Sequence, residues 1–337
     1  MNQTQCIAAE ASVLNREFNI VRVLFIILGS IIIVLLLHVI WSYKTNPLKL
    51  HTNIIILISN VLFLYAIFVL SYMFGAFMNF FVLFTYSDPC QCLIQVWLVY
   101  LLRMPAYIYN CASPMFHFFI MIERVLATIF AKIYENQGKI FGIISTIIVW
   151  GITLIYCLYI YITTRMDTNT FSHPMVYTSL TTIYNSQLLI YLPFVFLFFV
   201  ICISIADYFL ILRNRKIKSN FFNSSTNYYS LTKSYQTKQN ILLMRTIFPL
   251  DFSYSFVFAL FDVLSTIIRY NRFEYNMLAY VRNFEAIILL LFIHAIITLI
   301  VYEYFLKKQN EIRKNFVKIN MNISSEIYFK NLNLSWK

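Results

Sequence analysis

A few charged side chains stand inside long apolar stretches of the sequence. Arg103 lies in one such stretch, and Asp251 and Asp262 lie in another. Arg282 and Glu285 stand close together in a third. A charge in apolar surroundings is costly unless it is paired, so these groups must face one another, a wet cavity or a ligand. They are therefore candidates either for recognising a polar ligand or for internal ion pairs.

Sequence signatures of catalysis are missing. The chain contains no HExxH, no P-loop and no glycine-rich dinucleotide motif, and it has only 5 glycines. Its 5 histidines do not stand at metal-ligand spacing, and no Ser-His-acid or Cys-His pairing is suggested by position. We therefore expect no enzyme activity, no metal and no cofactor.

The apolar stretches are long enough to cross a lipid bilayer. Of 337 residues, 60% are hydrophobic and 12% are charged, whereas a soluble domain has about 25% charged residues. About 20 apolar residues span the hydrocarbon core, and a helix satisfies its own backbone hydrogen bonds in lipid. We predict an all-α membrane protein, a single bundle of seven transmembrane helices at 21–43, 52–77, 94–122, 140–163, 186–211, 240–267 and 277–305.

The distribution of positive charge predicts the orientation of this bundle. Most of the 26 Lys and Arg residues fall on one side, in alternate loops and at the C-terminal end, and cytoplasmic loops carry this excess. The bias is weakest at the first helix, where Arg16 and Arg22 nearly balance Lys44 and Lys49. The N-terminus is predicted to lie outside the cell. The expected regions are an extracellular N-terminus, the bundle and a cytoplasmic tail, at 1–20, 21–305 and 306–337.

Two cytoplasmic segments are basic. The loop at 213–238 is rich in Ser, Asn and Tyr, and suits either an acidic partner surface or anionic lipid. In the tail, Ile312, Phe316 and Ile319 follow helical spacing among basic residues, which is typical of an amphipathic helix on the inner leaflet, with a disordered segment as the alternative. Because the formal charge of +12 lies beside the membrane, we expect membrane lipid and no nucleic acid as a partner.

The predicted outer side carries two covalent candidates. Asn2 begins an Asn-Gln-Thr sequon and is a glycosylation candidate. Cys6, Cys90 and Cys92 face the oxidising exterior, where Cys6 can pair with either Cys90 or Cys92. The second outer loop contains no cysteine, so no disulfide can link it to the third helix.

The buried charges predict a ligand pocket in the outer half of the bundle. Asp251 and Asp262 are 11 residues apart in one helix, so they share a face, about 16 Å apart along it. We expect the third, sixth and seventh helices to gather charged and amphipathic side chains around a pocket: Arg103, Tyr107, Tyr109, Asp262, Arg282 and Glu285. The alternative is that Arg103 pairs with Glu285 or Asp262 only because both are buried.

The inner half of the bundle contains candidate moving parts. Glu123 and Arg124 stand where the third helix leaves the membrane, as either a conformational switch or an ordinary interfacial charge pair. Pro249 interrupts the sixth helix, as either a hinge or a static kink.

Two short motifs carry a family resemblance: Glu123-Arg124-x-x-Ala127-Thr128 with Tyr134-Glu135 in the following loop, and the aromatic ending at 328–336. They resemble the nematode serpentine chemoreceptors of the Sra, Srab, Srb and Sre group, with the Sre family as the best match. The resemblance implies a GPCR-like fold in the plasma membrane of sensory neurons. It implies a receptor that binds an environmental small molecule or peptide and activates a heterotrimeric G protein. It also assigns switching and coupling to Glu123, Arg124, Tyr134 and Glu135.

Other functional classes fit the sequence less well. A seven-helix ligand-gated channel or transporter is the main alternative, but transporters show repeated halves and glycine-broken helices, and this sequence shows neither. A seven-helix enzyme such as a lipid hydrolase lacks a visible set of metal ligands. The chain also lacks an NPxxY sequence in its seventh helix, so rhodopsin-type switching does not transfer in detail.

Overall fold

The described chain is almost entirely helical. The computed structural model describes residues 3–45, 51–130, 138–223, 231–271 and 276–335, with only the backbone path given over most of 214–223, 231–249 and 309–335. Its elements are α1 (Gln3–Leu14), α2 (Arg16–Thr45), α3 (Thr52–Thr85), the short 3-10 helix η1 (Pro89–Cys92), α4 (Val96–Ile129), α6 (Ile140–Met166), α7 (Thr168–Phe171), α8 (Ser186–Asn223), α9 (Leu231–Tyr270) and α10 (Met277–Ser335).

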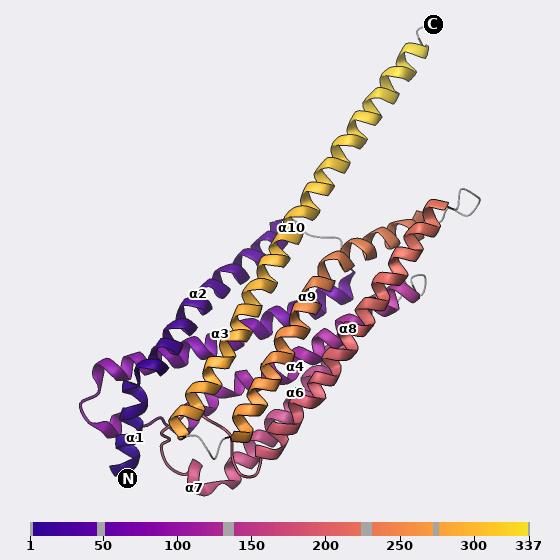
Figure 1. The fold of residues 1–337 in the computed structure, drawn as a ribbon. Helices are drawn as coiled ribbons and strands as arrows, with labels where there is room; N and C mark the ends of the chain where they lie inside the picture. Colours follow the sequence, from indigo (N-terminus) through magenta and orange to yellow (C-terminus); the bar gives the residue numbers. More distant parts are fainter. Residues whose placement is uncertain (1–2, 46–50, 131–137, 224–230, 272–275, 336–337) are drawn as a thin grey trace.

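Seven helices in the described ranges are long and apolar enough to cross a membrane, which confirms the predicted all-α bundle: α2, α3, α4, α6, α8, α9 and α10. Figure 1 shows them packed lengthwise, with the N-terminus, α1 and α7 at one end and the C-terminus at the other. We call these the outer and inner ends, after the orientation predicted from charge. Helix α4 is central, because it packs against α3, α6, α8 and α9.

Helices continue beyond the predicted membrane spans at three places. The N-terminal segment forms α1, and α8 and α9 extend into the segment 213–238 that was expected to be a loop. Lys, Arg, Gln and Leu favour helix, so a helix need not end where it leaves apolar surroundings. Helix α10 runs unbroken to Ser335 and projects beyond the bundle (Figure 1), so the helix expected in the tail is not a separate one. The extracellular and cytoplasmic assignments stay predictions.

Covalent and backbone links hold the outer segments over the bundle. Cys6 of α1 forms a disulfide with Cys90 of η1, and Cys92 is a buried free thiol. The second outer loop is held without a cysteine: Ile94 and Met175 exchange two backbone hydrogen bonds of 2.9 and 2.8 Å. These links place α1 and the loop after α7 across the outer end.

Removing the disulfide should destabilise the protein. We expect Cys6→Ser and Cys90→Ser each to lower the free energy of unfolding by about 2–4 kcal/mol, because the bond closes a long loop. The double variant should lose no more than either single one, and Cys92→Ser should cost much less. Thermal unfolding of the purified protein measures this loss; full additivity of the two single losses would contradict the pairing.

Candidate ligand-binding cavity

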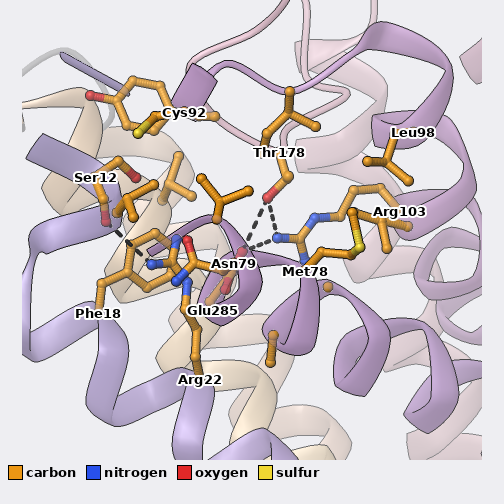
Figure 2. A pocket seen from close by; sticks show the side chains of 18 of the residues that line it. Ser12, Phe18, Arg22, Met78, Asn79, Cys92, Leu98, Arg103, Thr178 and Glu285 are labelled. Atoms are coloured by element: carbon orange, nitrogen blue, oxygen red, sulfur yellow. Dashed lines mark hydrogen bonds and ion pairs between the residues drawn. The ribbon is translucent and has the colours of Figure 1, made fainter. Parts of the chain in front are cut away.

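A cavity of about 170 Å³ lies at the outer end of the bundle, beneath α1 and the loop after α7. Its wall comes from α1, α2, α3, α4, α10 and the two outer loops, with these main contributors: Ser12, Phe18, Arg22, Phe25, Tyr72, Leu102, Arg103, Thr178 and Glu285. Figure 2 shows Arg22 and Arg103 reaching into it from opposite sides. We call it the outer cavity.

An ion pair joins two helices at the edge of this cavity. Arg103 of α4 donates to Glu285 of α10 and to the hydroxyl of Thr178 in the loop after α7. The two charged side chains are 13% and 6% exposed, so the pair is largely removed from water. The structure therefore selects Glu285, and not Asp262, as the partner of Arg103.

The opposite wall of the outer cavity carries a second guanidinium, at a position that the sequence indicates only as one charge in the orientation bias. Arg22 of α2 donates to the backbone carbonyl of Ser12 at 3.2 Å and to the side-chain carbonyl of Asn19 at 2.9 Å. Its guanidinium lies over the ring of Phe18, 3.7 Å from the ring centre. Both hydrogen-bond acceptors are neutral, so these contacts orient the positive charge without cancelling it.

Aromatic side chains form the inner boundary of the cavity. Phe25 and Tyr72 line it. On the side away from the cavity both pack against Phe292, whose ring centre is 5.1 Å from that of Phe25 and 6.0 Å from that of Tyr72. Tyr109 does not line a described cavity. It is fully buried and stacks on Phe68, with ring centres 4.3 Å apart, because its position on α4 faces the core.

Two smaller cavities, of about 40 and 30 Å³, continue from the outer cavity toward α8 and α9. Both are lined by Tyr107, Asn110 and Arg269, and the second also by Asp262. Within the described residues, Nε and Nη1 of Arg269 and one carboxyl oxygen of Asp262 are buried without a hydrogen-bond partner. The predicted residues Tyr107 and Asp262 thus lie deeper than the outer cavity, beside an arginine that was not predicted.

Two candidate ligand-binding residues lie outside these cavities. Arg282 binds Glu17 at the partly exposed outer rim, because its side chain turns toward α2 and not toward Glu285 one turn away. Asp251 lies deep in the bundle, where it is 3.0 Å from Nδ1 of His117 on α4. The ring of His117 stacks on Tyr254, with ring centres 3.8 Å apart. Asp251 is therefore part of a core link between α4 and α9.

Polar residues recur at intervals of seven along α4: Arg103, Asn110, His117 and Arg124. Seven residues advance a helix by nearly two full turns, so these side chains lie along one face. The contacts already described put this face toward α9 and α10. The spacing was visible in the sequence, but Asn110 and His117 are uncharged types and were passed over.

At the inner end of this face, Arg124 pairs with its neighbour Glu123, and both are buried. Both residues of this pair belong to α4. Tyr134, Glu135 and Asn2 lie outside the described residues, as does the side chain of Pro249. Predictions for these four residues stay predictions. The described residues include no group of three His, Cys, Asp or Glu side chains that could hold a metal ion.

Comparison with known families decides the class of protein. The model of the family described as serpentine type 7TM GPCR receptor class ab chemoreceptor matches residues 3–337. This chain is a class ab serpentine chemoreceptor. No curated protein matches it significantly. The finding supports the serpentine group that the motifs resemble, but not the narrower Sre assignment, because motifs of some twenty residues do not separate families with one common plan.

Membership of class ab supports a chemosensory receptor role and a multi-pass position in the membrane. In this class ab receptor, the match spans α1 as well as the seven membrane helices. The N-terminal helix that closes the outer cavity is therefore part of the family's own domain.

Proposed function

We propose that this receptor binds an environmental small molecule in the outer cavity and activates a heterotrimeric G protein at its inner end. The observation that carries the proposal is the cavity itself, which joins α2, α4 and α10 beneath the disulfide-linked α1. Disulfides persist in oxidising surroundings, which agrees with an extracellular outer end and with display at the plasma membrane of sensory neurons.

The geometry suggests how a ligand would act. Arg103 and Arg124 are on one face of α4, 21 residues apart, which is about 32 Å along the axis. Along this face, Glu285 connects Arg103 to α10, and Asp251 connects His117 to α9. A ligand that binds more tightly to one arrangement of these interhelical contacts shifts the receptor toward that arrangement. The inner end of α4, with Glu123 and Arg124, moves with it.

Replacing Arg124 tests the coupling step. We expect Arg124→Ala to abolish ligand-evoked calcium signals in cells that carry the receptor, a promiscuous G protein and a calcium indicator. The arginine is buried against Glu123 at the inner end, so its loss removes a charged contact at the place where the G protein would bind. A panel of volatile and water-soluble odorants supplies the stimulus, and an epitope tag measures surface display.

Arg165→Ala is the matched control, because Arg165 is an exposed arginine at the outer end of α6. It should respond as the wild type does. A normal response from Arg124→Ala at equal surface display would remove Arg124 from the mechanism. A ligand-evoked current in cells without functional G proteins would instead favour the channel alternative.

A further inference from the structure

The charges around the outer cavity do not balance. Its described lining contains two guanidinium groups, Arg22 and Arg103, but only one carboxylate, Glu285. Glu285 is bound to Arg103. Glu17, the acidic residue nearest to Arg22 in the sequence, is bound to Arg282 at the rim. The cavity therefore carries one positive charge in excess, and it resides on Arg22.

The surroundings of Arg22 prepare it for an anion. Asn19, Ser12 and Phe18 fix the guanidinium through two hydrogen bonds and one stacked ring, and none of them carries charge. Arginine binds carboxylates and other oxyanions through a planar fork of donors, and a fixed fork loses less entropy on binding. An anion in this cavity would meet a partner that is already oriented.

The remainder of the cavity wall limits the polarity and the size of the part of the ligand that does not contact Arg22. Apart from the charged groups, the wall is mostly apolar, with Phe25, Leu98 and Val281 among its members. The volume of about 170 Å³ is close to that of the ~150 Å³ cavity that accepts benzene. We propose that the outer cavity binds a small organic anion, a carboxylate or similar oxyanion on an apolar body about the size of a substituted benzene ring, with Arg22 as its partner.

Three nearly isosteric probes test this proposal on the purified full-length receptor in nanodiscs. Benzoate, benzamide and benzamidinium have similar shape and carry negative, zero and positive charge; hexanoate and hexanamide repeat the comparison with an aliphatic body. We expect the carboxylates to raise the apparent Tm of the receptor as their concentration rises. The amides should bind at least tenfold more weakly, and benzamidinium should not bind. Carboxylates that stabilise the wild type no more than their amides would overturn the proposal.

Variants of the arginine locate the binding partner. Arg22→Gln should weaken carboxylate binding about tenfold or more and leave amide binding unchanged, while Arg22→Lys should keep part of the preference for the anion. Arg165→Gln, outside the cavity, should bind as the wild type does. Unchanged carboxylate binding by Arg22→Gln would refute the role of Arg22. If Arg22→Gln does not fold, Arg22→Lys and the wild-type charge series decide the question.

The inference rests on the proposed function in one respect, the use of the outer cavity as the ligand site. Its experiment measures binding without a G protein, so the two can fail separately. A receptor that signals to neutral odorants but prefers no anion refutes the ligand class alone. A receptor that binds benzoate at Arg22 but activates no G protein refutes the coupling proposal alone.

Discussion

Arg103→Met is expected to lower the free energy of unfolding by about 3 kcal/mol or more, because it leaves the buried carboxylate of Glu285 without its cation. The remaining partner within the described residues is the hydroxyl of Thr178, at 3.4 Å from the carboxylate, which cannot balance a full charge. Thermal unfolding of the purified receptor should show an apparent Tm several degrees lower. The loss should also reduce surface display in cells.

Arg282→Met is the matched control, because Arg282 pairs with another glutamate at a far more exposed position. The side chains of Arg282 and Glu17 are 26% and 69% exposed, and exposed pairs contribute about 0–1 kcal/mol. A double-mutant cycle with Arg103→Met and Glu285→Gln should give a combined loss well below the sum of the single losses. Additive losses in that cycle would show that the two side chains do not stabilise one another.

Gly142→Ala is expected to destabilise the bundle by about 1–3 kcal/mol, through a clash between two helices. A Cβ atom at Gly142 would lie 2.9 Å from Cα and 3.0 Å from the backbone oxygen of Asn53 on α3. The amide of Gly142 also donates to the side-chain carbonyl of Asn53 at 3.0 Å. Backbone atoms cannot give way as a flexible side chain can, so α6 must move away from α3. Thermal unfolding of the purified variant measures the loss.

Gly151→Ala, on the same helix, separates this clash from the general effect of alanine. A Cβ atom at Gly151 meets nothing within 4 Å, and the residue is exposed. Alanine favours helix over glycine by about 1 kcal/mol in water, so this variant should be neutral or slightly more stable. If both variants have the same apparent Tm, the close approach of α3 and α6 at Gly142 is not important for stability.

The membrane helices were predictable because the signal for them is local. A run of apolar residues of sufficient length must be helical in lipid whatever surrounds it. The need for a partner at Arg103 was predictable for the same reason, since its sequence neighbours are apolar. Helix ends were less predictable, as α8 and α9 show, because polar residues with good helix propensity do not mark where a helix stops.

The sequence by itself therefore determined that lipid surrounds this protein, that its fold is helical, and which residues must find polar partners. Only the tertiary structure decided which partners they find: Glu285 for Arg103, Glu17 for Arg282 and His117 for Asp251. It also placed Arg22 in the outer cavity and Gly142 against another backbone. The physical reason is that side-chain direction turns by about 100° per residue along a helix, so partners depend on how each helix is rotated against its neighbours.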